Sequence, residues 1–297
     1  MEQTRRCSLR RRVSGVTECR CYCVRVPPMR VLVRCAALLV AVASPVAAQS
    51  PIGVGTSAGV VKLTDQRSEE ALSGVLEYQP NPWLSLYAIP AVLHLSDNVN
   101  GRPVSSSGLG DLPLVVAASY AFPTPGSPTV GAALVTVLPT GNAACGLGSG
   151  QTAAGLDLGV AISPRQAHLA VDASRSLSGV SAQSSLDAPK ATALHVEAGY
   201  DVAPRWTWTA SVGVDVGSDS TQALSRVIGA GVRHTLAHSL MVTIDGSHGL
   251  TAASPRWILS VGVGTAFAGS SPVTPTTPLR RLKSTFNSGN TAKIGCR

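Results

Sequence analysis

Ten ionisable side chains lie within apolar stretches at positions that alternate with hydrophobic residues. The run from Leu194 shows the pattern, because His195 and Glu197 alternate there with Leu194, Val196 and Ala198. Carboxylates, imidazoles and guanidinium groups can hydrogen-bond to one another or to a polar solute, so we expect them to share one hydrated face. The full set is Glu77, Asp111, Asp157, His168, Asp172, His195, Glu197, Asp215, Arg233 and Asp245.

The serine and histidine spacing gives little support for nucleophilic catalysis. Ser247 and His248 are adjacent in an alternating stretch, so their side chains point to opposite faces of a strand. His94 and Ser96 are two residues apart and share a face, but they lack the Asn-Gly that follows this spacing in outer-membrane phospholipases. We therefore predict that the protein is not an enzyme.

Metal and nucleotide signatures are also weak. Cys19, Cys21 and Cys23 have the wrong spacing for a zinc knuckle and no histidine partner. The Gly-x-Gly runs, such as Gly262 to Gly264, are not followed by a helical pattern, as a dinucleotide site requires. We predict no cofactor and no metal.

The element that must position the ionisable residues is a β-hairpin over residues 194–216. Its two arms alternate strictly, and Ala203-Pro204-Arg205 forms the turn between them. Each arm is long enough to cross a bilayer as a tilted strand, which needs about 9–11 residues. A soluble sandwich would bury the apolar face against a second sheet, whereas a membrane barrel would turn it toward lipid and enclose the polar face.

The rest of the chain predicts twelve such strands and no sustained helix. Short turns alternate with longer connections, as in outer-membrane barrels with an even strand number. We therefore predict an all-β fold, a closed antiparallel up-and-down transmembrane β-barrel of about 12 strands. The expected strands are 52–63, 71–79, 83–95, 109–121, 129–138, 154–163, 166–175, 191–202, 205–217, 222–235, 239–248 and 256–267. The expected longer connections are 64–70, 96–107, 139–153, 176–190, 218–222 and 249–255.

Aromatic residues make up only 4% of the chain, so their positions are informative. They cluster beside the expected short turns, where a membrane–water boundary favours amphipathic rings. This distribution favours a membrane barrel over a sandwich, which would hold its Trp side chains at mid-strand. The predicted periplasmic girdle comprises Tyr78, Trp83, Tyr120, Phe122, Tyr200, Trp206, Trp208 and Phe267.

The N-terminal region has the pattern of an export signal that follows an N-terminal extension. Residues 31–43 are apolar apart from Arg34, and Val46-Ala47-Ala48 offers small residues for cleavage before Gln49. We interpret residues 1–28 as an upstream extension with the true start at Met29, and residues 29–48 as a signal peptide. The predicted barrel spans residues 49–267, followed by a disordered basic tail rich in Pro, Ser and Thr over residues 268–297.

The positive charge of the chain belongs to its two ends. The whole sequence carries +8, but residues 1–48 hold nine Arg and two Glu, and residues 268–297 hold five basic and no acidic residues. The span 49–267 therefore has a net charge of −4. Nucleic-acid binding thus loses its main support.

The last expected strand, 256–267, places Trp257, Leu259, Val261 and Phe267 on one face and ends on the aromatic ring. It resembles the C-terminal signal that the barrel-assembly machinery recognises in outer-membrane barrels. We therefore expect that machinery and outer-membrane lipid as partners. The tail beyond is either a periplasmic segment or the product of a shifted reading frame.

A family resemblance lies between residues 108 and 162. Gly108-Leu109-Gly110-Asp111 opens a strand, Leu138-Pro139-Thr140-Gly141 ends the next, and Gly148-Ser149-Gly150 precedes the strand from Gly155 to Ile162. This order resembles the transporter-like outer-membrane barrels named for the MetA pathway of phenol degradation. The motif residues are Gly108, Gly110, Asp111, Pro139, Thr140 and Gly141. The resemblance implies an outer-membrane channel for aromatic or other small hydrophobic compounds.

Two function classes follow for a protein in the outer membrane of a Gram-negative bacterium. The first is a channel or transporter for a small hydrophobic substrate, with an acidic lumen that disfavours anions. The second is a structural or surface-interaction barrel whose lumen is closed. In the second case the inward carboxylates pair with Arg233, the His residues and water to fill the barrel. A secreted soluble β-sandwich is a third, weaker reading.

Overall fold

A computed structural model describes residues 51–178, 192–216, 225–236 and 240–265. The predicted extension, signal peptide and tail lie outside these described residues, as does Phe267. These assignments therefore remain predictions.

The described residues form strands and a single turn of 3-10 helix, η1 (Ala143–Cys145). No helix among them is long and apolar enough to cross a bilayer. The first strands are β1 (Ile52–Lys62), β2 (Ser68–Asn81), β3 (Leu84–Ala88), β4 (Ala91–Val99), β5 (Arg102–Leu109), β6 (Leu112–Ala121) and β7 (Thr129–Leu138). The remaining strands are β8 (Ala153–Ile162), β9 (Ala167–Ser178), β10 (Thr192–Ala203), β11 (Trp206–Val216), β12 (Arg226–Thr235), β13 (Met241–Gly249) and β14 (Trp257–Gly264).

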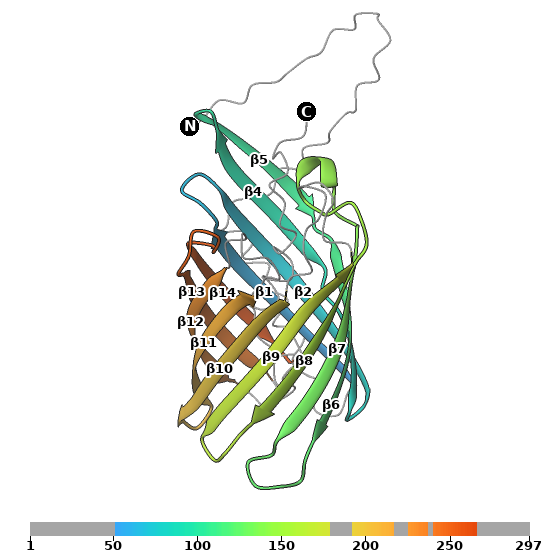
Figure 1. Cartoon of the computed structure of the whole chain (residues 1–297). Helices are drawn as coiled ribbons and strands as arrows, with labels where there is room; N and C mark the ends of the chain where they lie inside the picture. Colours follow the sequence, from blue (N-terminus) through green and yellow to red (C-terminus); the bar gives the residue numbers. More distant parts are fainter. Residues whose placement is uncertain (1–50, 179–191, 217–224, 237–239, 266–297) are drawn as a thin grey trace, which may run out of the picture.

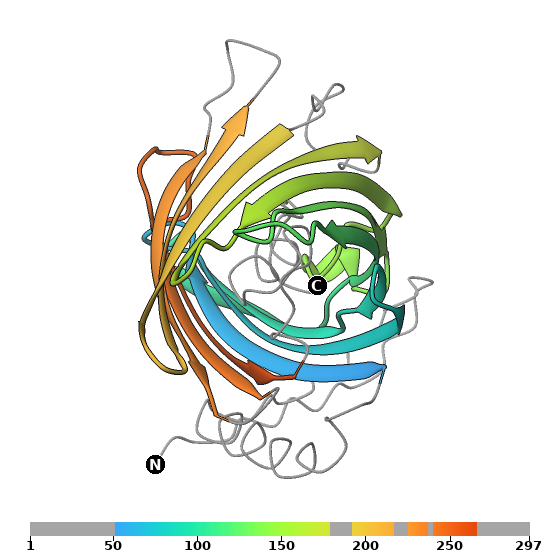
Figure 2. The same cartoon turned by 90° about the horizontal axis from the view of Figure 1, so that it is seen from below.

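The sheet closes on itself because β1 pairs antiparallel with both β2 and β14. Ser57 lies opposite Ser73 on one side and Gly262 on the other. Around the ring the order is β1-β14-β13-β12-β11-β10-β9-β8-β7-β6-β3-β2, which makes twelve strands. The view from below shows the strands encircling one interior (Figure 2). The predicted closed, antiparallel, twelve-stranded all-β barrel is confirmed.

The third and fourth strands of the ring are each divided in two at the same level. β3 passes to β4 at Ile89-Pro90, and β5 passes to β6 at Gly110-Asp111. Pro90 has no N–H to donate to a ladder, although its carbonyl accepts a hydrogen bond from the Gly74 N–H at 2.8 Å. Above the division β2 pairs with β4, and below it β2 pairs with β3.

The predicted long connection over residues 96–107 is wrong. The structure instead has a β-hairpin, β4–β5, whose turn is Asn100-Gly101. Both residues have positive φ, 54° and 78°, as a type I′ hairpin turn requires, and Asn-Gly is the sequence that favours this turn. The polar composition of the flanking residues obscured a local turn signal. This hairpin extends above the rest of the wall (Figure 1).

One edge of this hairpin has no ladder partner among the described strands of the barrel wall. Among the described residues, β5 forms its ladder with β4 alone and ends the sheet order. The connection that contains η1 packs there instead, and Leu147 approaches Gly108 so closely that a Cβ at Gly108 would lie 2.9 Å from its Cδ1. The buried apolar residues at this contact are Ala71, Ala91, Leu93, Leu95, Cys145 and Leu147.

The outer face of the barrel is hydrophobic. Along β8, Leu158 and Val160 are each 51% exposed, while the intervening Asp157 and Gly159 point to the interior. Leu259 on β14 and Ile244 on β13 are exposed to the same extent. Hydrophobic side chains thus form the outer band, and most of the polar strand residues lie inside.

Candidate functional site

The interior of the barrel collects the ionisable residues singled out in the sequence. The strand registers place nine of the ten on the inward-facing parity, and Asp111 lies between β5 and β6. Asp172, for example, lies opposite His195, and Asp245 lies opposite Gly231 and Ser260. Their inward position follows from the same alternation that places Leu158 and Ile244 outside. A role for any one of them in transport stays a prediction.

One side of the interior, formed by β9 to β14, is a polar wall. Asp172 Oδ1 lies 3.2 Å from His195 Nδ1, and the Arg233 guanidinium donates to the Glu197 carboxylate across two intervening ladders. These side chains are 12–21% exposed. At this burial the Arg233–Glu197 ion pair is only partly screened, so it ties β12 to β10 across β11.

A second polar cluster lies at the short-turn end of the same wall. His168 Nε2 is 3.1 Å from Asp201 Oδ2, and the Thr207 hydroxyl donates to Asp201 Oδ1 at 2.6 Å. The other ring nitrogen of His168 is 3.2 Å from Ser163 Oγ. Asp201 was not among the predicted lumen residues, although the alternation through His195 and Glu197 includes it.

The opposite side of the interior is an apolar wall, which the sequence analysis missed. Val75, Tyr87, Ile89 and Val115 are 1–6% exposed and pack together with Ala117. These residues come from β2, β3, the segment after β3, and β6. The third strand was ambiguous from the sequence because Pro90 interrupts its alternation. The inward parity of Val75, set by Glu77 two residues later, was the available signal.

The lumen is therefore two-faced rather than uniformly acidic. Glu77 is the predicted lumen carboxylate closest to the apolar wall, and it accepts a hydrogen bond from the Tyr87 hydroxyl at 2.7 Å. The remaining predicted residues Asp157 and Asp215 also lie inward, on β8 and β11.

Asp111 has a structural role at the division of the fourth strand. Its carboxylate accepts hydrogen bonds from the Gly141 N–H at 3.0 Å, the Ser149 N–H at 2.6 Å and the Ser149 hydroxyl at 2.8 Å. The Thr140 hydroxyl donates to the Gly110 carbonyl at 2.8 Å. These hydrogen bonds join residues about thirty positions apart and hold the connection containing η1 against the barrel. We call this hydrogen-bonded group the Asp111 clasp.

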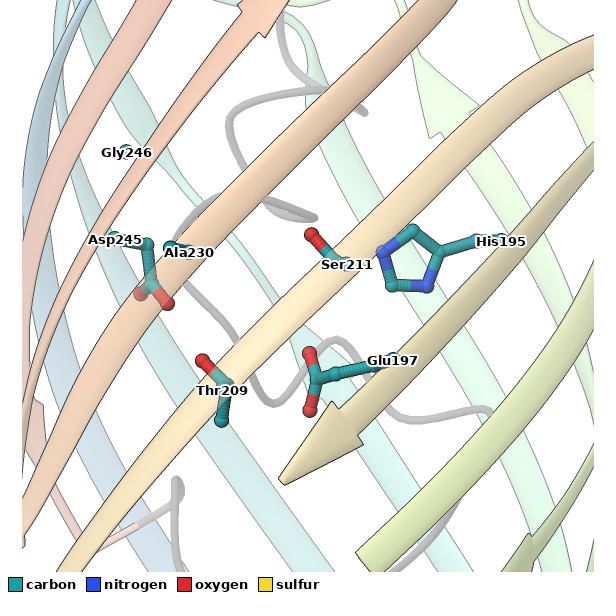
Figure 3. A pocket seen from close by; sticks show the side chains of 7 residues that line it. All are labelled: His195, Glu197, Thr209, Ser211, Ala230, Asp245 and Gly246. Carbon is teal, nitrogen blue, oxygen red and sulfur yellow. The ribbon is translucent and has the colours of Figure 1, made fainter. Parts of the chain in front are cut away.

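A recess in the polar wall is centred on Asp245 (Figure 3). Asp245 is 6% exposed, and its Oδ2 has no hydrogen-bond partner. Figure 3 shows the Asp245 carboxylate on β13, the Glu197 carboxylate on β10, and the Thr209 and Ser211 hydroxyls on β11 between them. The residues that line the recess are His195, Glu197, Thr209, Ser211, Ala230, Asp245 and Gly246.

Aromatic side chains project outward at the short-turn end of the barrel. Trp208 is 61% exposed and lies opposite Tyr200, and Trp206 stacks on His234 with ring centroids 4.1 Å apart. The predicted girdle residues that the structure describes are all exposed: Tyr78, Trp83, Tyr120, Phe122, Tyr200, Trp206 and Trp208. Phe267 lies outside the described residues, and the function of the girdle stays a prediction.

The structure separates the serine from the histidine in both of the spacings considered for catalysis, as the alternation predicted for Ser247 and His248. Ser247 points inward and is 7% exposed, whereas His248 lies on the outer face. His94 Nδ1 lies 2.6 Å from Ser107 Oγ, across the β4–β5 ladder, rather than bonding to Ser96. Within the described part of the chain, no three His, Cys, Asp or Glu residues group as metal ligands.

The sequence matches no family model and no curated protein. Among solved structures, the chain is similar to the COG4313 outer membrane channel from Pseudomonas putida F1, with 16% identity and a TM-score of 0.55 over 73% of this chain and 95% of that one. It is also similar to the CymD monoaromatic hydrocarbon channel, with 11% identity and a TM-score of 0.45 over 73% and 88% of the two chains. The KdgM porin gives 9% identity and a TM-score of 0.44 over 71% and 97%. The shared feature is the fold.

Proposed function

We propose that the protein is an outer-membrane channel for small aromatic or other hydrophobic compounds. The observation that carries the proposal is the inverted distribution of polarity across a closed barrel. Leu158, Val160 and Leu259 are about half exposed on the outside, while Asp172, Glu197 and Asp245 are enclosed. Acyl chains are the environment in which such an outer band is stable, and a closed barrel leaves no unpaired strand edge in lipid.

Placement in the outer membrane is supported by the fold and by the predicted export signal at residues 29–48. The exposed Trp208 and Tyr200 at the short-turn end suit a membrane–water boundary. The structural likeness to a COG4313 outer membrane channel agrees with this placement. Outer-membrane lipid and the barrel-assembly machinery are the partners that this proposal requires.

The substrate class is inferred from the apolar wall. Val75, Ile89 and Val115 form a packed cluster on the inner face, and Val135, which packs against them, is partly exposed. A channel for sugars or ions would not need such a wall. The family resemblance around Gly108 to Gly141 points to the same class of compounds. We therefore expect phenol-sized aromatic solutes to pass more readily than sugars of equal mass.

A structural barrel with a closed lumen is the second candidate. The observation that favours it is the packing of the interior: Arg233 pairs with Glu197, and Val75, Tyr87 and Ile89 contact one another. Twelve strands lie between the eight of a side-chain-filled barrel and the sixteen of an open porin. Measured flux of solutes and ions through the barrel distinguishes the channel from the closed structural barrel.

The test is uptake of radiolabelled phenol by proteoliposomes, together with conductance in planar bilayers. Gly159 faces the lumen and the adjacent Val160 faces outward at 51% exposure, so they provide a matched pair. Gly159→Trp should reduce both uptake and conductance several-fold, whereas Val160→Trp should leave them unchanged. Absence of flux in the unmodified protein would favour the structural barrel.

A further inference from the structure

We propose that the Asp245 recess binds the ammonium head of a small amphiphilic cation whose apolar body lies in the lumen. This inference rests on the proposed channel function, which it deepens by naming the charge class of one substrate. It depends on three features: the carboxylate with an unsatisfied oxygen, the surrounding acceptor oxygens, and the apolar wall on the far side of the interior.

The absence of a side chain at Gly231 makes room for the carboxylate. Gly231 lies opposite Asp245 on β12, and a Cβ there would collide with Asp245 Oδ1. The same Cβ would be 2.8 Å from Thr209 Oγ1, which approaches from β11. The Asp245 carboxylate and the Thr209 hydroxyl therefore approach Gly231 from the two strands that flank β12.

Asp245 differs from its neighbours in that one of its carboxylate oxygens accepts no hydrogen bond from the described residues. Arg233 interacts with it electrostatically, but the Arg233 guanidinium donates to Glu197. Glu197 is paired with Arg233, and Asp172 is close to His195, but Asp245 Oδ2 accepts no hydrogen bond although the residue is 6% exposed. A buried polar group without a partner is costly, and native proteins rarely leave one without water or a ligand. This oxygen is therefore an unsatisfied acceptor on a residue that lines the recess.

Hydroxyl groups extend the acceptor surface around the carboxylate. Thr243 and Ser247 flank Asp245 two positions away on β13, and Ser260 lies opposite it on β14. The hydroxyl oxygens of these three residues are buried and without hydrogen-bond partners. Thr209 and Ser211 line the recess from β11. An –NH3⁺ group can donate to the carboxylate and to the Thr209 and Ser211 hydroxyl oxygens, whereas an anion would face the Asp245 and Glu197 carboxylates.

The size of the recess limits the bound group. Its volume is about 10 Å³, which is near the smallest space that holds one water molecule. A primary ammonium head fits this volume, and a quaternary ammonium does not. The rest of such a solute must remain in the lumen, where Val135, which packs against the opposite apolar wall, is partly exposed.

The test uses 2-phenylethylammonium as the probe, with 3-phenylpropionate as the anion of similar shape and K⁺ as the cation without an apolar body. Binding to the full barrel in nanodiscs is measured by calorimetry, and block of the ionic current is measured in planar bilayers. We expect binding and block by 2-phenylethylammonium, weaker binding of K⁺, and no binding of 3-phenylpropionate.

Two variants disable the recess in different ways. Asp245→Asn removes the charge with little change of shape, and Gly231→Ala displaces the carboxylate without changing the charge. Both should weaken 2-phenylethylammonium binding by about tenfold, because a hydrogen bond to a charged group is lost. Asp215→Asn is the matched control: it removes one inward carboxylate from β11, about 13 Å along the strand from Ser211, and should change binding less than twofold.

The outcomes separate this inference from the channel proposal. If Asp245→Asn and Asp215→Asn weaken 2-phenylethylammonium binding equally, the proposed recess site is wrong, because binding then depends only on the overall charge of the lumen. If neither 2-phenylethylammonium nor K⁺ binds, the proposed site is also wrong, and water is then the partner of the unpaired oxygens. Binding that depends on Asp245 in a barrel without ionic current would support the recess while contradicting the channel. Heat-modifiable migration on gels confirms that each variant has folded.

Discussion

At the scale of single residues, Asp111 shows how one carboxylate can organise a connection that the strands do not hold. Its two oxygens accept three hydrogen bonds from Gly141 and Ser149, which lie thirty or more positions away. Gly148 contributes by its lack of a side chain, since a Cβ there would collide with Asp111 Oδ1. Hydrogen bonds to a charged acceptor contribute about 1.5–3 kcal/mol each, so this clasp outweighs a typical surface contact.

Asp111→Ala should release the connection that contains η1 without unfolding the barrel. We expect hydrogen exchange at the Gly141 and Ser149 amides to become at least about tenfold faster, because each loses an acceptor. The measurement is hydrogen–deuterium exchange of the folded protein followed by mass spectrometry. Asp97→Ala is the control, since the Asp97 carboxylate accepts from its neighbour Asn98. Unchanged exchange in Asp111→Ala would refute the clasp.

At the scale of elements, the divided third strand explains how the apolar wall forms. Ile89 follows β3 and is 1% exposed, and its N–H donates to the Pro113 carbonyl at 3.0 Å. Pro90 then ends the ladder, and β4 continues along the other half of β2. The break leaves Ile89 at the centre of the cluster with Val75 and Val115.

Ile89→Ala should destabilise the barrel by about 2–4 kcal/mol, because it removes buried hydrocarbon and leaves a cavity in a packed cluster. Leu86→Ala, on the outward face of β3 with 36% exposure, is the matched control and should cost about 1 kcal/mol or less. Reversible denaturant unfolding in lipid vesicles measures both. Equal losses for the two variants would mean that the inner cluster is not packed as described.

At the scale of the whole molecule, the barrel is organised by which environment each face meets. The outer band holds Leu158, Val160 and Ile244, each 51% exposed. The interior holds ion pairs such as Arg233–Glu197 and hydroxyls such as Thr243, which is fully buried. A soluble protein with this outer surface would associate or aggregate, whereas a lipid bilayer covers it.

Leu158→Arg should therefore lower the free energy of unfolding in lipid by about 2–4 kcal/mol, the cost of a basic side chain near the bilayer midplane. Ser174→Arg is the control: Ser174 lies inward on β9 opposite Asp157, where an added cation meets an acid. We expect it to be tolerated within about 1 kcal/mol. Denaturant titration in vesicles distinguishes the two, and equal tolerance of Leu158→Arg would contradict the lipid-facing assignment.

The sequence by itself determined the strand class and the twelve-stranded closure, and its alternation predicted an inward face for the ionisable residues. These features follow from the two-residue alternation of polar and apolar side chains, as around His195 and Glu197. The alternation can be read from adjacent residues, and the apolar face must contact either lipid or a protein core. Even the hairpin missed at residues 96–107 had a local signal, Asn100-Gly101.

Only the tertiary structure decided which inward residues meet. The clasp from Asp111 to Ser149, the apolar cluster around Ile89, and the unsatisfied carboxylate of Asp245 opposite Gly231 each depend on strand register and on the break at Pro90. Register is a relation between strands distant in sequence, and a local period cannot supply it. Alternation therefore specifies the face of each side chain, but closure of the barrel specifies its neighbours.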